Sequence, residues 1–109
     1  MTTIRFLTEG SRITGFEVSG HSGYAEAGSD IVCAAVTGAV RLVEATINDV
    51  FGLAAAVKVR ERSGSISLRL PGGLSDRDEH AVQGFLSGMM LYLTELHDEY
   101  PDNIEVLEA

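Results

Sequence analysis

The fold is decided by the segment IVCAAVTGAVRLVEATINDVFG, which runs from Ile31 to Gly52. Its apolar residues recur at helical spacing, and its alanines permit close packing against a neighbouring layer. This pattern predicts a helix from Ile31 to about Phe51, with more than half of its surface buried. Ser29 or Asp30 is expected to cap the N-terminus by accepting a hydrogen bond from a free backbone N–H. Gly52 is expected to end the helix.

Segments with alternating apolar residues and turn signals flank this helix on both sides. A second apolar stripe predicts a helix that is capped by Ser75 or Asp76 and ends near Tyr100. Strands are predicted at 3–8, 12–19, 54–62, 65–70 and 104–107. The order β-β-α-β-β-α-β indicates an α+β fold with two layers. Its mostly antiparallel sheet would carry both helices packed on one face, because that arrangement buries both stripes.

Three local features of these strands are also predicted. Ile13 is out of phase with the apolar residues that follow it, and Gly15 is expected to mark a β-bulge. Ser63-Gly64 reads as a two-residue turn. Val57 and Val59 are expected to point into the core.

Composition indicates one globular domain over residues 1–109. Hydrophobic residues make up 45% of the chain, and 8 Lys and Arg against 16 Asp and Glu give a net charge of −8. This charge argues against a nucleic-acid binder with a broad basic face, and it permits a basic partner. Cys33 is the only cysteine, which excludes an internal disulfide and a cysteine-rich zinc site and favours a reducing, cytoplasmic setting.

Membrane association is not expected from the sequence. Arg41, Glu44 and Asp49 interrupt the longest apolar region, so no transmembrane span is predicted. The first residues, Met1–Arg5, lack a basic start followed by an apolar stretch, so no signal peptide is predicted.

The segment from His21 to Cys33 is the place where chemistry is expected. Residues 20–30 contain three glycines and no apolar period, and they are predicted to form a long loop. His21 would follow the end of a strand, and Cys33 would lie in the first turn of the helix, near its third residue. Outward-pointing N–H groups there favour a thiolate, and an imidazole could act as its partner or base. The same N–H groups could bind an oxyanion, while the Asp30 carboxylate would oppose the thiolate slightly.

The alternative is that Cys33 is a small, inert core residue without a chemical function. His80 and His97 are 17 residues apart, do not have zinc-ligand spacing, and are predicted to be solvated. The glycines of residues 20–28 match neither the dinucleotide nor the P-loop pattern. The acidic residues of the C-terminal region predict a solvated face or a docking surface for a basic partner: Glu95, Asp98, Glu99, Asp102 and Glu105.

The segment GHSGYAEAGSDIVCAAV, residues 20–36, resembles the ribosomal-processing cysteine protease family, Prp. The family pattern is close to G-H-x-G-x-A-x-x-G-x-D-I-x-C-A-A-x-S, and nearly every fixed position is matched over 18 residues. Thr37 stands where the family usually has Ser, and its hydroxyl is retained.

The resemblance implies a Cys–His endopeptidase without a cofactor or metal. Cys33 matches the nucleophile, His21 the general base, and Asp30 a supporting or orienting residue. The family removes a short N-terminal extension from the large-subunit ribosomal protein whose arm approaches the peptidyl-transferase centre. It is described as homodimeric, and it is not expected to bind nucleic acid or membranes. Its substrate loop is mobile, and the matching loop residues here are Gly20, Gly23, Tyr24 and Gly28.

Two other functions remain open from the residues alone. The first is a non-enzymatic acidic adaptor that binds basic ribosomal proteins and would not need Cys33. The second is another thiol chemistry, such as a redox sensor or an acyl carrier, with a reactive Cys33 but no peptide cleavage. A redox sensor would need an intermolecular partner, because the chain has no second cysteine.

Overall fold

The computed structural model describes residues 1–20, 27–60, 62 and 64–109, with residues 27–30 described by their backbone alone. The order of elements predicted from the sequence is confirmed, with a π-helical extension of the first helix. The elements are β1 (Thr2–Glu9), β2 (Arg12–Ser19), α1 (Ala27–Glu44), η1 (Ala45–Val50), β3 (Ala56–Arg60), β4 (Ser65–Arg69), α2 (Asp76–Glu99) and β5 (Ile104–Glu108).

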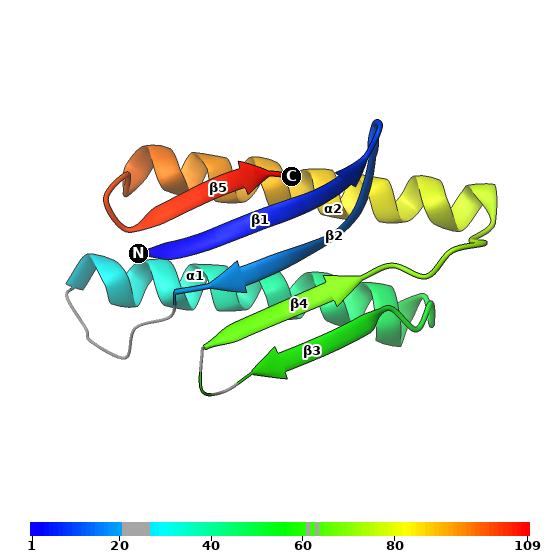
Figure 1. Ribbon diagram of the computed structural model, residues 1–109, viewed down its shortest axis with the longest axis horizontal. Helices are drawn as coiled ribbons and strands as arrows, with labels where there is room; N and C mark the ends of the chain where they lie inside the picture. Colours follow the sequence, from blue (N-terminus) through cyan, green and yellow to red (C-terminus); the bar gives the residue numbers. More distant parts are fainter. Residues whose placement is uncertain (21–26, 61, 63) are drawn as a thin grey trace.

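The strands form one sheet in the order β3-β4-β2-β1-β5. The pairs β1/β2, β2/β4 and β3/β4 are antiparallel, and β5 returns beside β1 in parallel. Both helices lie on the same face of this sheet (Figure 1). The predicted α+β architecture, with a mostly antiparallel sheet and two helices on one face, is therefore confirmed.

A β-bulge in β2 explains the phase change around Ile13. Leu7 pairs with Gly15 and Thr8 pairs with Ile13, so Thr14 is the extra residue, immediately before the predicted Gly15. The bulge returns Ile13 to the core side. Gly15 has a separate role, because a Cβ there would lie 2.1 Å from the carbonyl oxygen of Leu68 on β4.

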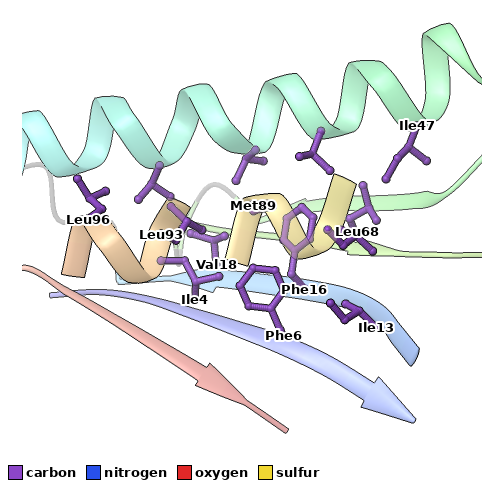
Figure 2. Close-up of a cluster of buried hydrophobic side chains, with 14 of the residues drawn as sticks. Ile4, Phe6, Ile13, Phe16, Val18, Ile47, Leu68, Met89, Leu93 and Leu96 are labelled. Atoms are coloured by element: carbon purple, nitrogen blue, oxygen red, sulfur yellow. The ribbon is translucent and has the colours of Figure 1, made fainter. Parts of the chain in front are cut away.

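The core lies between the sheet and the two helices, and Figure 2 shows its side chains meeting there. β1 and β2 place two phenylalanine rings at its centre, Phe6 and Phe16, with ring centroids 6.2 Å apart. The helices contribute the apolar stripes that the sequence predicted. From α1 and η1 these buried residues are Val32, Val36, Val40, Val43 and Ile47, and from α2 they are Val82, Leu86, Met89, Leu93 and Leu96.

The first helix begins earlier than predicted. α1 starts at Ala27, so Ser29 and Asp30 are helical residues and neither is the N-terminal cap. Residues 27–30 contain two glycine or alanine positions and no apolar period, so periodicity could not detect this extra turn. The predicted loop of residues 20–30 is correspondingly too long at its C-terminal end.

The other end of this helix follows the prediction more closely. The backbone N–H of Phe51 donates to Thr46, and the N–H of Leu53 donates to Ile47, which closes the wide π-helical turn. Gly52 then adopts a φ of +65° and ends the helix as predicted.

By length and composition alone, residues Ile31–Val50 would suffice to cross a membrane. The sequence predicted no span because three charged residues interrupt this helix. Those charges do not exclude a span by length and composition. Five of its apolar residues are nevertheless buried in the core of a two-layer fold, which accounts for the helix's apolar character.

Two predictions for the β3–β4 hairpin are wrong. β3 covers only Ala56–Arg60 and is therefore shorter than the predicted strand 54–62, and Arg60 pairs with Ser65 of β4. The two-residue turn at Ser63-Gly64 stays a prediction. Ser63 lies outside the described residues. Val57 packs against the core as predicted, but Val59 is 63% exposed. β3 is an edge strand of the sheet, paired with β4.

The second helix is predicted almost to the residue. Ser75 is its N-cap and accepts a hydrogen bond from the backbone N–H of Asp78 at 3.1 Å, so Ser75 rather than Asp76 caps it. His80 is exposed as expected. His97 is not simply solvated, since its Nδ1 lies 2.6 Å from the carbonyl oxygen of Ile104 and connects α2 to β5.

Candidate active site

Cys33 is half-buried in the second turn of α1, beside the start of β1. Its Sγ lies 3.9 Å from the Oγ1 of Thr2, within hydrogen-bonding range for sulfur. The thiol is therefore neither fully enclosed nor on open surface. The partial exposure argues against an inert core cysteine, because a reagent or substrate must be able to reach a reactive thiol.

Gly20 fixes where the chain leaves β2. It has a φ of +82°, and a Cβ at this position would lie 2.2 Å from the carbonyl oxygen of Met1. Only glycine fits this combination of conformation and close approach. Gly20 thus lies against the residue preceding Thr2, whose hydroxyl contacts the Cys33 sulfur.

Several predicted site residues lie outside this description. His21, Gly23 and Tyr24 are not among the described residues, and for Gly28 and Asp30 only the helical backbone is described. The distance between His21 and Cys33 and the role of Asp30 therefore stay predictions. The described chain brings together Gly20, the start of β1 and Cys33.

The early start of α1 changes the electrostatics expected at Cys33. The free N–H groups of an α-helix belong to its first four residues, here 27–30. Cys33 is the seventh residue counted from Ala27, so its own N–H is placed to bond within the helix. The prediction that Cys33 lies near the third helical residue is wrong, and the helix dipole acts on it more weakly, because the effect falls off after the first turn.

A hollow of about 330 Å³ lies between α1 and the β3–β4 hairpin. Thr37 and Arg41 follow Cys33 at successive intervals of four residues, so all three lie along one side of the helix. The hollow begins at Thr37, one turn from the thiol. Its lining is mainly aliphatic, with two arginines: Val18, Val36, Thr37, Val40, Arg41, Val59, Arg60, Gly64, Ser65 and Ile66.

A larger groove of about 610 Å³ lies between α1 and α2. It occupies the other side of α1 from Thr37 and Arg41, and its lining is almost wholly apolar. Leu42, from α1, is 69% exposed at this groove, and Tyr92, from α2, is also exposed there. Thr46 and Tyr92 contribute hydroxyl groups to this lining, and its other described residues are apolar, which is typical of a packing surface.

Among the described residues, no group of three His, Cys, Asp or Glu side chains is placed to hold a metal ion. Thr2 is the site residue that the sequence argument missed. No local motif marks it, and its contact with Cys33 joins residues 31 positions apart. Only the pairing of β1 within the sheet brings the two together.

Comparison with known proteins identifies relatives over almost the whole chain. The model of a family described as "Cysteine protease Prp" matches residues 1–105. The Ribosomal processing cysteine protease Prp of Bacillus subtilis (strain 168) is 30% identical over 94 residues, which cover 86% of this chain and 84% of the relative.

Solved structures with the same fold include two similar proteins. The ribosomal processing protease Prp from S. aureus, in complex with a substrate peptide, matches with a TM-score of 0.85 at 21% identity over 100% of both chains. The protein SMU.848 from Streptococcus mutans matches with a TM-score of 0.86 at 22% identity, covering 99% of this chain and 93% of its own. At this identity the structures establish a shared fold.

Proposed function

The chain belongs to the cysteine protease Prp family, and on that basis we propose that it is an endopeptidase with Cys33 as nucleophile and His21 as general base. The observation that carries the assignment is the position of Cys33. Cys33 is half-buried, and its thiol lies beside the start of β1. Gly20 packs against the same end of β1, and His21 follows Gly20 in the sequence.

The proposed reaction needs no group beyond these side chains. The Cys33 thiolate attacks the scissile carbonyl carbon, and the C–N bond breaks as protonated His21 gives its proton to the leaving amine. Water then attacks the thioester, passes a proton to His21, and releases the acid product while the sulfur is freed. Asp30 orients the site. The loop that contains Gly23 and Tyr24, between Gly20 directly after β2 and Gly28 in the first turn of α1, closes over substrate.

The substrate is a ribosomal protein with a removable N-terminal extension, and cleavage takes place in the cytoplasm, where ribosomes are assembled. Support comes from the name of the B. subtilis relative, a ribosomal processing protease, and from the peptide complex of the S. aureus protein. The net charge of −8 favours encounter with such a basic protein. The hollow beginning at Thr37 accepts apolar side chains of the extended peptide that lie next to the scissile bond.

The same proposal includes a homodimer. The apolar groove between α1 and α2 is flanked by exposed Leu42 and Tyr92, and Leu91 is also exposed on α2. Contiguous apolar surface of this kind marks interaction sites on soluble proteins. A two-fold contact would place Leu42 of one copy in the groove of the other, because such interfaces are self-complementary.

A cleavage assay tests the enzymatic assignment. The full chain and its Cys33→Ala and His21→Ala variants are incubated in reducing buffer with the ribosomal protein that carries its extension, and the products are identified by mass spectrometry. His80→Ala is the matched control, because His80 is an exposed histidine on α2. We expect a single cut near the substrate's N-terminus, lost in the first two variants and retained in the control.

Other results of this assay would contradict the assignment in different ways. If substrate binds but stays intact, and binding survives Cys33→Ala, the chain is an acidic adaptor. If the thiol reacts quickly with iodoacetamide and no peptide bond is cut, the chain performs another thiol chemistry. A salt-independent cleavage rate would remove the proposed role of the acidic surface in substrate encounter.

A further inference from the structure

Thr2 is unusual among the polar residues of this protein. Its exposed fraction is 3%, and among the described residues it is the only polar residue that is buried. Its hydroxyl oxygen lies 3.9 Å from the Cys33 sulfur, within hydrogen-bonding range. No buried side-chain nitrogen or oxygen in the described part of the chain lacks a partner, and the contact with the thiol is a hydrogen bond available to this hydroxyl. Either atom of this contact can be the donor while the thiol is neutral.

The position of Thr2 is set by the sheet rather than by a surface loop. Its backbone N–H donates to the carbonyl oxygen of Asn103 at 2.9 Å, and it pairs with Ile104 in the parallel β1/β5 ladder. β5 is tied in turn to α2, because the Nδ1 of His97 lies 2.6 Å from the carbonyl oxygen of Ile104. On the other side, Gly20 packs against Met1. The backbone that carries the hydroxyl is therefore held by β5, which α2 contacts, and by the packing of Gly20 against Met1.

A thiolate in this position needs a donor that α1 does not supply. The free N–H groups of the helix belong to residues 27–30, one turn before Cys33. A thiolate accepts hydrogen bonds and cannot donate, so a neighbouring hydroxyl must turn its proton toward the sulfur. Hydrogen bonds to ionised groups are shorter and stronger than those between neutral groups, and such contacts often tighten only when the charge forms.

We propose that Thr2 is a positioning residue for Cys33, whose hydroxyl donates to the sulfur, orients it and stabilises its thiolate form. This role rests on the proposed function of Cys33 as nucleophile. The contact between neutral groups is 3.9 Å long. When the thiol loses its proton, the bond shortens and the sulfur is held in one rotamer. Thr2 thereby adds a further positioning group to the proposed Cys–His pair.

The test measures alkylation of the single cysteine by iodoacetamide between pH 5 and 10, together with kcat and KM for the ribosomal substrate. Thr2→Val removes the hydroxyl at constant shape, and Thr2→Ser keeps the hydroxyl. Thr3→Val is the matched control, because Thr3 is the next residue of β1 and its side chain points to the opposite face of the sheet. Thermal unfolding is recorded for every variant.

We expect Thr2→Val to slow alkylation at pH 7 about tenfold, the order that loss of a hydrogen bond to a charged group produces. Its rate–pH profile should move to higher pH, and kcat should fall while KM is unchanged. Thr2→Ser should retain most of the wild-type alkylation rate and kcat. Thr3→Val should match the wild type in both quantities. If Thr2→Val does not fold, Thr2→Ala serves as the variant without the hydroxyl.

A wild-type alkylation profile in Thr2→Val would overturn the proposal, as would a loss in Thr2→Ser equal to that in Thr2→Val. Either result would make Thr2 a packing residue. Because alkylation needs no substrate, this outcome is separate from failure of the protease assignment. A displaced alkylation profile in a protein that cuts no ribosomal substrate would support the Thr2–Cys33 bond and contradict only the peptidase function.

Discussion

The side-chain amide of Gln83 bonds both backbone polar groups of Ile13. The N–H of Ile13 donates to Oε1, and Nε2 donates to the carbonyl oxygen of Ile13, each at 2.8 Å. Ile13 lies beside the bulge at Thr14, where the β1/β2 ladder is interrupted. The Gln83 side chain therefore supplies the hydrogen bonds that a neighbouring strand would make with Ile13. These bonds hold α2 against the bulged end of β2.

We expect Gln83→Leu to lower the free energy of unfolding by about 2 kcal/mol, because it leaves both Ile13 groups without a partner. Gln83→Glu should also be destabilising, since its carboxylate still accepts from the N–H but places an oxygen against the Ile13 carbonyl oxygen and the Glu79 carboxylate. Urea unfolding followed by circular dichroism measures both, with exposed Ser87→Ala as the control. A Gln83→Leu variant as stable as the control would show that water replaces the amide at no cost.

Gly20→Ala should be among the most damaging single substitutions in the chain. The added Cβ would meet the Met1 carbonyl oxygen at 2.2 Å, and φ is +82°, so both sterics and backbone conformation oppose it. We expect a loss of at least about 2 kcal/mol in unfolding free energy, together with slower alkylation of Cys33. Gly84→Ala is the contrasting variant. Nothing lies within 4 Å of a Cβ there, and alanine in this exposed helical position should gain about 0.5–1 kcal/mol.

Two substitutions in the connection between η1 and β3 should change the free energy of unfolding in opposite directions. Ala54 has a φ of +55° and is exposed, so Ala54→Gly should raise the free energy of unfolding by about 0.5–1 kcal/mol. Gly52 has a φ of +65° with open space around it, so Gly52→Ala should lower it by about 1 kcal/mol through the backbone alone. Thermal unfolding of the two variants and the double variant checks this. Changes of the same sign would contradict the left-handed conformation at one of the two positions.

The fold could be predicted from the sequence further than the site could. Apolar stripes and turn residues were enough for the order of elements, because each stripe must face a second layer. Periodicity failed where a helix carries no apolar period, as at Ala27–Asp30, and where two apolar residues share a strand but only one is covered, as for Val57 and Val59. The pairing of β5 with β1 also depends on contacts distant in sequence.

For the site, the family resemblance identified Cys33 and His21 as candidates, and the half-exposed thiol agrees with a reactive cysteine. The resemblance did not indicate Thr2, because that contact depends on how β1 is held by β5 and β2. Local sequence also misplaced Cys33 along its helix by several residues. Cys33 therefore lies beyond the free N–H groups of the helix start, and a side-chain hydroxyl, that of Thr2, is its hydrogen-bonding neighbour.

The Arg12–Glu79 ion pair should stabilise the fold by an amount that does not vary with pH in the neutral and mildly alkaline range. The hydrogen bond that Arg12 donates to the Glu79 carboxylate raises the pKa of Arg12 above its ordinary value. A raised pKa means that the guanidinium's contribution is complete below the ordinary value and is lost only as pH rises through the higher one. We expect Arg12→Met to cost about 1 kcal/mol at both pH 7 and pH 9.

The matched control for this pair is Arg69→Met, which breaks the ion pair between Arg69 and Glu17, 3.2 Å apart on the open face of the sheet. Its partners are more exposed, so its loss should stay within about 0.5 kcal/mol. Urea unfolding at the two pH values measures both variants. A loss in Arg12→Met that shrinks between pH 7 and pH 9 would mean that another titrating group, not the guanidinium, accounts for the stabilisation.

The proposed dimer predicts a substitution that changes assembly without changing the fold. Leu42→Glu places a carboxylate in the apolar groove between α1 and α2, where burial against a second copy would leave the charge unpaired. We expect sedimentation to show a dimer for the wild type and a monomer for Leu42→Glu, with unchanged circular dichroism. Val59→Glu is the control, since Val59 is similarly exposed but lies on β3, away from this groove. Dissociation by the control and not by Leu42→Glu would move the interface to the β3 edge of the sheet.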